Sequence, residues 1–428
     1  MLQACWCTGV NMSCEHGRSL VDIIREKYNP DNYPVRRIIL NTPPQITPRD
    51  YLNVPPILVL NMCDIAAAGD ESQILELCSH VTELDLSHNS FKDWEEIGKI
   101  VGQMPRMQFL NLSANPLGTC PSPPSLRLPS LRKLVLNNTK TSWETVHTLL
   151  RNMPQLEELF LCLNDYTTVV VSPDVYHNMK LLHITDNQLR EWQDVLMLGL
   201  IFPSLETMVL SNNRVGSLSS EPAELTQAFT NLKHLNLHNW GLSDWSDVEK
   251  LNHFPSLEEL RLLGIPLLSE YNDEQRRKLT VARLPAVQVL NGSWVSDSER
   301  EDAERFFIRY YMDFPTNQQP PRLAELQERH GQLEPLAEVD LTPKDVAQVQ
   351  VHFDGCCRAL AIRLDQTVAQ LKRELREALE SREGTCRIRI FHVAENMGAQ
   401  IVEEMRFPRR NVHTYGVRDG DEIHVMRK

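Results

Sequence analysis

Leucines recur in a fixed frame through the first two thirds of the chain. The frame is LxxLxLxxNxL, in which apolar and polar positions alternate over a short strand and an asparagine follows. Segments with this frame lie at 81–91, 107–117, 156–166, 179–189 and 205–215, and looser copies lie at 131–141, 232–242 and 257–267. The asparagine slots are 23 to 27 residues apart. This period predicts a leucine-rich repeat solenoid of about eight repeats.

Each repeat should form one short strand whose leucines point into a core shared with its neighbours. The asparagine should turn the chain after the strand and bind backbone groups that are left unpaired there. Thr139, Trp240 and Ile265 replace it in three repeats. Because two of these departures come late in the chain, we expect the hydrogen-bond ladder to loosen towards the end of the solenoid.

Tryptophans add a second period. Trp94, Trp143, Trp192 and Trp245 each open a run with helical spacing of apolar residues, and each run stops near a proline. We therefore predict helices in alternate repeats, with irregular segments such as 118–129 and 167–178 between them. Periodic tryptophans could anchor a ligand, but core packing is the favoured interpretation.

Both ends of a solenoid need caps, because exposed core would aggregate. At the front, 55–65 imitates a repeat, and we interpret 1–54 as a separate, partly disordered segment. At the back, Ser296 and Glu299 form a capping-box pair that opens a helix at 296–311. The solenoid and its caps are thus assigned to 55–311. Its last helix should turn aromatic side chains inward, namely Phe306, Phe307 and Tyr310.

Residues 312–428 differ from the repeats in composition and in the spacing of their apolar residues. Residues 312–345 are rich in Pro, Gln and Glu, which predicts a linker with one short helix at 321–330. In 346–428 the pattern predicts two strands around a DG turn, a helix at 368–380 and two further strands. This order and the phrase YGVRDGDEIHV resemble ubiquitin-like domains. The expected fold class is therefore α/β: a leucine-rich repeat solenoid followed by a C-terminal ubiquitin-like β-grasp domain. A terminal Gly-Gly is missing, so we expect this domain to be docked or recognised rather than conjugated.

Charge and composition indicate what kind of molecule the solenoid binds. The net charge is −13, and 348–428 contribute +2 from 14 Lys/Arg and 12 Asp/Glu, which leaves −15 on 1–347. An acidic solenoid repels nucleic acid and anionic membranes, so the expected partner is a protein. No apolar run is long enough to cross a bilayer, no secretory signal is evident, and the cysteines lack framework spacing, all of which favours a cytoplasmic location.

The sequence offers little for catalysis. It contains no GxxxxGK[ST] loop, GxSxG elbow, HExxH helix or EF-hand loop, so we expect no enzyme activity and no cofactor. Cys5, Cys7, Cys14 and His16 could nominally bind zinc. Their spacing is not a standard one, so a disordered tail is the favoured interpretation and no metal site is expected.

Several long segments resemble the tubulin folding cofactor E family, and the resemblance covers about 20–428. They are LVLNNTKTSWETVH (134–147), LEELFLCLNDY (156–166), RLLGIPLL (261–268), EREDAERFFIRYY (299–311) and LEPLAEVDL (333–341). Cofactor E has an N-terminal CAP-Gly domain, and nothing before residue 55 is similar to one. The chain is therefore more similar to the branch of the family without that domain.

The resemblance implies a cytoplasmic, cytoskeleton-associated protein that binds tubulin, with α-tubulin as the expected subunit. It further implies disruption of the α/β-tubulin heterodimer and delivery of tubulin to proteasomal degradation, which would destabilise microtubules. The alternatives from other classes are an adaptor that delivers a different protein to the ubiquitin–proteasome system, and a regulator of a phosphatase.

The outward strand positions supply the candidate binding surface on the concave face of the solenoid. Outward apolar residues in mid-solenoid should form an exposed patch, made of Val135, Phe160, Leu181 and Val209. Apolar patches on soluble proteins often mark interfaces. The other interpretation is that the linker or the C-terminal domain folds over the patch. His183, His234 and His238 are either polar surface or partner contacts. The predicted binding residues are Phe109, Val135, Phe160, Leu181, His183, Val209, Asn236 and Arg261.

A second candidate surface lies on the C-terminal domain. In the final strand, Ile423 and Val425 should face the core and leave His424 and Met426 outward. On the neighbouring strand, Ile388 and Ile390 share one face and Arg387, Arg389 and Phe391 share the other, and the sequence does not set which face is outward. With Ile390 outward, it would form a patch for proteasomal receptors together with His424 and Met426. The equally weighted alternative is that this surface packs on the solenoid.

Overall fold

The computed structural model describes residues 17–29, 52, 54–118, 126–170, 173–335, 345–379, 387–396 and 399–428. The chain divides into two compact units, with the boundary between Pro335 and Leu336. The nominal zinc ligands Cys5, Cys7, Cys14 and His16 lie outside the described residues, and so does most of the interval 30–53. Within the described ranges, no helix combines the length and apolar character that crossing a membrane requires.

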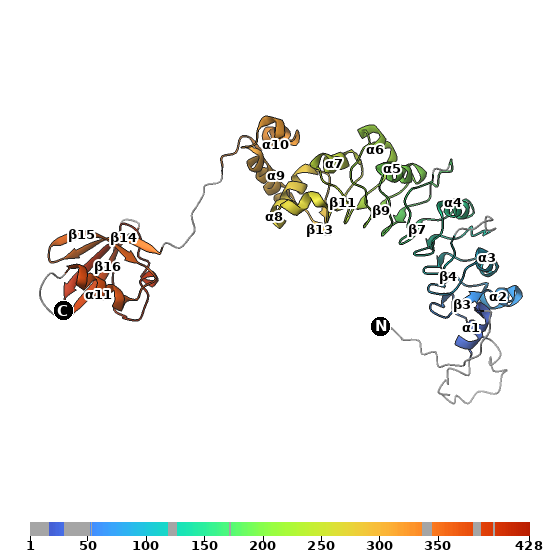
Figure 1. The fold of residues 1–428 in the computed structure, drawn as a ribbon, viewed down its shortest axis with the longest axis horizontal. Coiled ribbons are helices and arrows are strands. Elements are labelled where there is room, and N and C mark those ends of the chain that lie inside the picture. The colour runs from blue at the N-terminus through green and yellow to red at the C-terminus, as the bar shows by residue number, and fades with distance from the viewer. Residues whose placement is uncertain are drawn as a thin grey trace, which may run out of the picture. The chain divides into compact units, whose positions relative to one another are not determined.

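The first unit contains an eleven-stranded sheet in which the strands follow chain order, so that each repeat adds one strand (Figure 1). Neighbouring strands from β2 to β12 pair in parallel, and β13 closes the sheet as an antiparallel strand. This confirms the predicted leucine-rich repeat solenoid. The strands are β2 (Ile57–Val59), β4 (Glu83–Asp85), β5 (Phe109–Asn111), β6 (Lys133–Val135), β7 (Glu158–Phe160), β8 (Leu181–His183), β9 (Thr207–Val209), β10 (His234–Asn236), β11 (Glu259–Arg261), β12 (Val289–Leu290) and β13 (Ser293–Trp294).

The middle residue of each repeat strand points into the core. Leu84 aligns with Leu110, and Leu110 aligns with Leu134, without any shift in register. All three are at most 1% exposed. The first and third residues of each strand therefore point to the opposite face, because side chains alternate along a strand.

The asparagines form the expected ladder between repeats. The Asn115 side-chain amide donates to the backbone carbonyls of Leu86 and Leu112, each at 2.9 Å, and its Oδ1 accepts from the Phe91 amide at 3.2 Å. The same bond to the preceding repeat is made by the other ladder asparagines, which are Asn89, Asn164, Asn187 and Asn213.

Two of the three departures from asparagine keep part of this bonding. The Thr139 hydroxyl donates to the Leu136 carbonyl at 2.9 Å. The Trp240 indole Nε1 donates to the Leu210 carbonyl at 2.8 Å, which is the bond to the preceding repeat. The expected loosening at Trp240 is therefore wrong, because an indole N–H can replace an amide donor. Ile265 carries no side-chain donor.

The tryptophan runs form the predicted helices, which lie along the outer side of the curved sheet (Figure 1). Trp94, Trp143 and Trp192 are each 3% exposed, which confirms core packing. A further helix, α6, lies in a repeat where none was predicted; Pro222 at its first turn and a Glu221–Glu224 capping box start it. These helices are α3 (Trp94–Gly102), α4 (Trp143–Arg151), α5 (Trp192–Ile201), α6 (Pro222–Ala228) and α7 (Trp245–Lys250).

The front cap begins earlier than predicted. Helix α1 (Leu20–Lys27) buries Leu20 and Ile24 in the same core as the repeats, and the short strand β1 (Arg18–Ser19) pairs with β3 (Ile65–Ala67). Helix α2 (Glu71–Cys78) completes this end. The interpretation of 1–54 as a separate segment is thus wrong for the described residues 17–29. These residues lie outside the repeat frame, so the leucine pattern gave no sign of them.

The back cap extends further than predicted. Ser296 caps α9 (Asp297–Tyr311) by accepting from the Glu299 amide at 3.2 Å, which is one half of the expected capping box. The Glu299 carboxylate pairs with Arg277. Phe307 is fully buried, whereas Phe306 and Tyr310 are half-buried. Helix α10 (Arg322–His330) buries Leu323 and Leu326 against α9 and α8 (Asp273–Arg283), so it belongs to the cap rather than to a linker. Short 3-10 turns also occur in this half, η2 (Leu251–His253), η3 (Pro266–Glu270) and η4 (Thr316–Gln318).

The second unit is a five-stranded sheet in the order β15-β14-β18-β16-β17. Its core forms where α11 meets the sheet, with Leu371 and Leu375 packed among Val351, Ile390 and Ile423. The strand β17 was not predicted. The elements are β14 (Val346–Phe353), β15 (Cys356–Arg363), α11 (Val368–Leu379), β16 (Ile388–Asn396), β17 (Ala399–Glu404), the 3-10 turn η5 (Val412–Tyr415) and β18 (Glu422–Arg427).

Candidate functional site

The outward positions of strands β5 to β11 bring the predicted binding residues onto one face. Because the strands pair in register, Phe160 lies beside His183 and His183 lies beside Val209. Arg261 is exposed, and most of the others are half-buried. The half-buried residues are Phe109, Phe160, Leu181, His183, Val209 and Asn236.

Val135 does not belong to the exposed patch. Only 9% of it is exposed, although it occupies an outward strand position. It lies in register between Asn111 and Phe160. Both neighbours carry longer side chains, and these flank the shorter valine on its two sides. The prediction of an exposed Val135 is therefore wrong.

Phe160 is the centre of an ordered aromatic contact. The Lys133 ammonium lies 4.7 Å from the centre of the Phe160 ring, and the His183 ring meets it edge-on with 5.5 Å between ring centres. Lys133 also forms an ion pair with Glu158 at 2.8 Å and lies 5.9 Å from the Phe109 ring. A cation over an aromatic face is an attractive contact, so Phe160 is held in place by its neighbours. Lys133 was not among the predicted binding residues.

Burial favours the neutral form of the His183 imidazole. Burial lowers the pKa of His183, and the nearby carboxylate of Asp186 opposes that shift only in part. Its Nδ1 lies 3.3 Å from the Cys162 sulfur, and burial raises the pKa of the Cys162 thiol. Burial thus favours the uncharged forms of His183 and Cys162 beside Phe160, and the charged groups next to this ring are Lys133 and Glu158.

Next to this centre the face becomes polar. A hollow of about 320 Å³ is lined by His183, Val209, His234, Asn236 and Arg261, among others. The Thr207 hydroxyl lies 3.2 Å from His234 Nδ1, and Arg261 pairs with Glu259 at 3.4 Å. His238 follows strand β10, and its amide donates to Asn236 Oδ1 at 3.0 Å. The surface thus joins an apolar centre to hydrogen-bonding groups, as protein interfaces commonly do.

On the second unit, two of the three predicted surface residues, His424 and Met426, lie on the outward side of β18. Met426 is 56% exposed and His424 is half-buried, while Ile423 and Val425 face the core as predicted. Ile390 is fully buried, so its assignment to the surface is wrong.

The cause is that alternation along β16 separates two faces without showing which of them meets the core. Phe391, not Ile390, lies opposite His424 in the sheet, and Arg389 stands over the Phe391 ring at 5.1 Å. Arg389 also pairs with Glu404 at 2.7 Å. The outward apolar residue of this surface is therefore Phe391.

Comparisons with known proteins agree with the architecture of the first unit. A family model described as leucine-rich repeat matches 174–310. Among solved structures, the LRIM1/APL1C complex has a TM-score of 0.34 and 15% identity over 55% of this chain and 38% of that chain, values too low to support an argument.

Two of three curated relatives match over nearly the whole length of the chain, and the third over about half of it. The tubulin-specific chaperone cofactor E-like protein of Rattus norvegicus is 51% identical over 424 residues, which cover 96% of this chain and 98% of the relative. The Homo sapiens protein of the same name is 50% identical over the same shares. Tubulin-specific chaperone E of Homo sapiens is 32% identical over 57% of this chain and 47% of its own. Because half of the residues are identical over nearly the full length of both chains, this chain belongs to the family of tubulin-specific chaperone cofactor E-like proteins.

Proposed function

We propose that this protein binds tubulin through the concave face of its solenoid, disrupts the α/β-tubulin heterodimer and promotes tubulin degradation, thereby destabilising microtubules. α-Tubulin is the subunit that we expect it to hold. It would act in the cytoplasm as a binding protein and not as an enzyme. The names of its relatives support tubulin as the partner, and the aromatic centre at Phe160 is the observation that supports the concave face.

Apolar side chains gather on one face of an otherwise acidic solenoid. The first 347 residues carry a net charge of −15 by sequence, yet Phe109, Phe160, Leu181 and Val209 gather on one face. An aromatic side chain at the centre of an interface commonly contributes much of the binding energy, provided that polar groups surround it and exclude water. Lys133, Glu158 and the hollow near Arg261 supply such groups.

The test is the Phe160→Ala variant in a binding assay with purified tubulin heterodimer. We expect tubulin binding to weaken at least tenfold, because a hot-spot residue contributes about 2 kcal/mol or more. The unfolding temperature should change little, since the ring is only half-buried. Leu200→Ala is the matched control, because Leu200 is 39% exposed on helix α5, away from the strand face. Unchanged binding in Phe160→Ala would contradict the proposed surface.

For the second unit, we infer a ubiquitin-like domain that docks on a proteasomal receptor. Its support is the strand order, in which the first and last strands pair in parallel at the centre, and the helix that follows the first hairpin. Phe391, His424 and Met426 would form the docking surface, with Arg389 beside it.

Deleting 346–428 tests this role. If the truncated protein still binds tubulin but tubulin is no longer degraded in cells, the second unit is a dock. Unchanged degradation would contradict the docking role without affecting the proposal for the solenoid. Co-purification of a cullin scaffold or a phosphatase catalytic subunit in place of tubulin would favour the adaptor or phosphatase alternative.

A further inference from the structure

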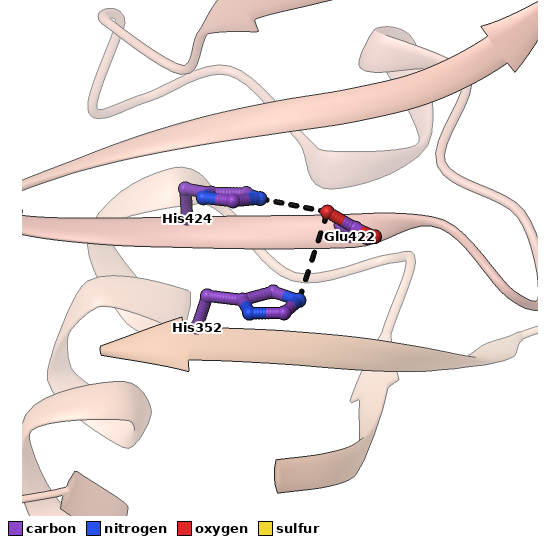
Figure 2. Close-up of side chains that lie close together, drawn as sticks. All are labelled: His352, Glu422 and His424. Atoms are coloured by element: carbon purple, nitrogen blue, oxygen red, sulfur yellow. Dashed lines mark hydrogen bonds and ion pairs between the residues drawn. The ribbon is translucent and has the colours of Figure 1, made fainter. Parts of the chain in front are cut away.

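Two histidines and a glutamate converge on the sheet of the second unit (Figure 2). His352 lies on β14, and Glu422 and His424 lie on β18. The two strands pair in parallel, and His352 is directly opposite His424. Glu422 precedes His424 by two residues, so both point to the same face of the strand. All three side chains are half-buried.

Their ligand atoms point towards one place. Glu422 Oε2 lies 2.8 Å from His424 Nε2 and 3.6 Å from His352 Nε2. The imidazole rings are stacked, with 4.5 Å between their centres and 15° between their planes, and Figure 2 shows both turning a ring nitrogen towards the carboxylate. The three ligand atoms lie within 4.8 Å of one another.

We propose that His352, Glu422 and His424 bind a Zn²⁺ ion. A tetrahedral Zn²⁺ with bonds of about 2.0–2.2 Å to nitrogen and oxygen keeps its ligand atoms roughly 3.3–3.5 Å apart. Small side-chain rotations bring the observed distances into that range, because half-buried side chains have room to turn. Two imidazoles with one carboxylate form a ligand set of borderline softness that suits zinc better than calcium or magnesium.

A thiol on the neighbouring strand β15 lies near one of the three ligands. Cys357 is opposite His352 in the sheet, and its sulfur lies 3.7 Å from His352 Nε2. Cys357 is exposed, so the fourth ligand is either water or this thiolate. The three other ligands do not depend on that choice, and zinc binding should persist when the thiol is removed.

The competing explanation is that the cluster is only a hydrogen-bonded network. Each neutral imidazole can donate one N–H to the Glu422 carboxylate, which would satisfy all three groups without a metal. The two explanations differ in what they predict for added zinc: a ligand set binds it with a defined stoichiometry, and a hydrogen-bonded surface network does not.

The experiment is a Zn²⁺ titration of the full chain, stripped of metal, in competition with a chromophoric chelator. We expect His352→Ala and His424→Ala each to lose one zinc equivalent relative to the wild-type protein, and Glu422→Gln to weaken that site at least tenfold. The matched control is His413→Ala, an exposed histidine of the same unit outside the cluster. It should bind as the wild-type protein does.

Other thiols of the chain could also bind zinc, so the comparison is repeated in a Cys356→Ser/Cys357→Ser background. If the protein with both serine substitutions still binds the zinc equivalent that depends on His352 and His424, the proposal is supported. Zinc should also raise the unfolding temperature of the wild-type protein more than that of His424→Ala, because a ligand that binds only the folded state stabilises it. Equal zinc stoichiometry and affinity in the wild-type, His352→Ala and His424→Ala proteins would overturn the proposal. Because no tubulin is present, this result is independent of the proposed function.

Discussion

The Arg283 guanidinium lies 3.9 Å from the centre of the Trp245 ring, and this contact joins helix α8 to helix α7. Arg283 is 1% exposed. It pairs with Glu249 at 3.1 Å, donates to the Leu279 carbonyl at 3.0 Å and also lies 4.7 Å from the Phe307 ring of α9. One buried cation thus connects the last repeat with the back cap.

Arg283→Met should therefore destabilise the first unit by about 2–4 kcal/mol, since it leaves a partly buried carboxylate without its partner. Burial already raises the pKa of Glu249, and Arg283 opposes that rise. Urea unfolding measures the loss. The double variant Arg283→Met/Glu249→Gln should recover part of it. Arg305→Met is the control, because Arg305 pairs with Glu301 on the exposed side of α9, and little change is expected there. Equal effects of the two single variants would contradict a connecting role for Arg283.

Trp240 gives a prediction that runs against the repeat pattern. Trp240→Asn restores the residue that the pattern favours, yet it removes a side chain that is 1% exposed and packs near Trp192. We expect it to cost about 3–5 kcal/mol through the cavity that it leaves. Trp240→Phe should cost less, because a phenyl ring fills more of the space that the indole leaves than an asparagine does. In both variants the Leu210 carbonyl keeps its bond from Asn213 at 2.8 Å. Urea unfolding of both variants provides the measurement. A Trp240→Asn protein as stable as the wild type would show that the indole is dispensable.

The repeats were predictable because their physics is local and periodic. The leucine frame fixes which residues of a strand face the core, and parallel stacking fixes their neighbours. Exposure of the outward residues was less predictable. It depends on the length of the side chains in the adjacent repeats, which the pattern of one repeat does not contain. Val135 is buried between Asn111 and Phe160 for this reason.

Features without a repeating pattern were also missed. Helix α1 covers the front of the core with few residues, and no copy of it elsewhere in the chain signals its role. Ile390 was assigned to a surface because a single strand does not reveal which of its two faces meets the core. The convergence of His352 with Glu422 and His424 required the parallel pairing of β14 and β18, which the sequence order alone does not show.

Stability of the first unit should fall as the pH drops below about 6.5, the ordinary pKa of histidine. Burial lowers the pKa of His147, and a hydrogen bond to the Val170 carbonyl opposes this in part. Burial lowers the pKa of His183 as well. Because both pKa values are lowered in the folded state, the unfolded chain takes up protons first, and stability is lost as the pH falls from 6.5 towards the folded pKa values.

Thermal unfolding at pH 7.5, 6.5 and 5.5 measures this dependence. His147→Gln/His183→Gln should show a shallower fall than the wild-type protein over that window, because glutamine does not titrate. His413→Gln is the control, since that histidine is exposed on the other unit. If the double variant keeps the full pH dependence, other groups account for it.

Two helical glycines should respond to alanine in opposite directions. A Cβ on Gly199 in α5 would lie 2.7 Å from the backbone oxygen of Ala228 and 2.7 Å from the Phe229 ring, so α6 would have to move. Gly199→Ala should destabilise the first unit by about 1–3 kcal/mol, as overpacking of a filled core does. A Cβ on Gly98 in α3 meets only Leu126 at 3.8 Å, which is an ordinary contact. Gly98→Ala should therefore stabilise by about 0.5–1 kcal/mol, because alanine loses less backbone entropy in a helix. Urea unfolding of both variants under the same conditions provides the comparison. Stabilisation of the protein by Gly199→Ala to the same extent as by Gly98→Ala would contradict the close packing of α5 and α6. The absence of a side chain at Gly199 would then not be required by the approach of the two helices.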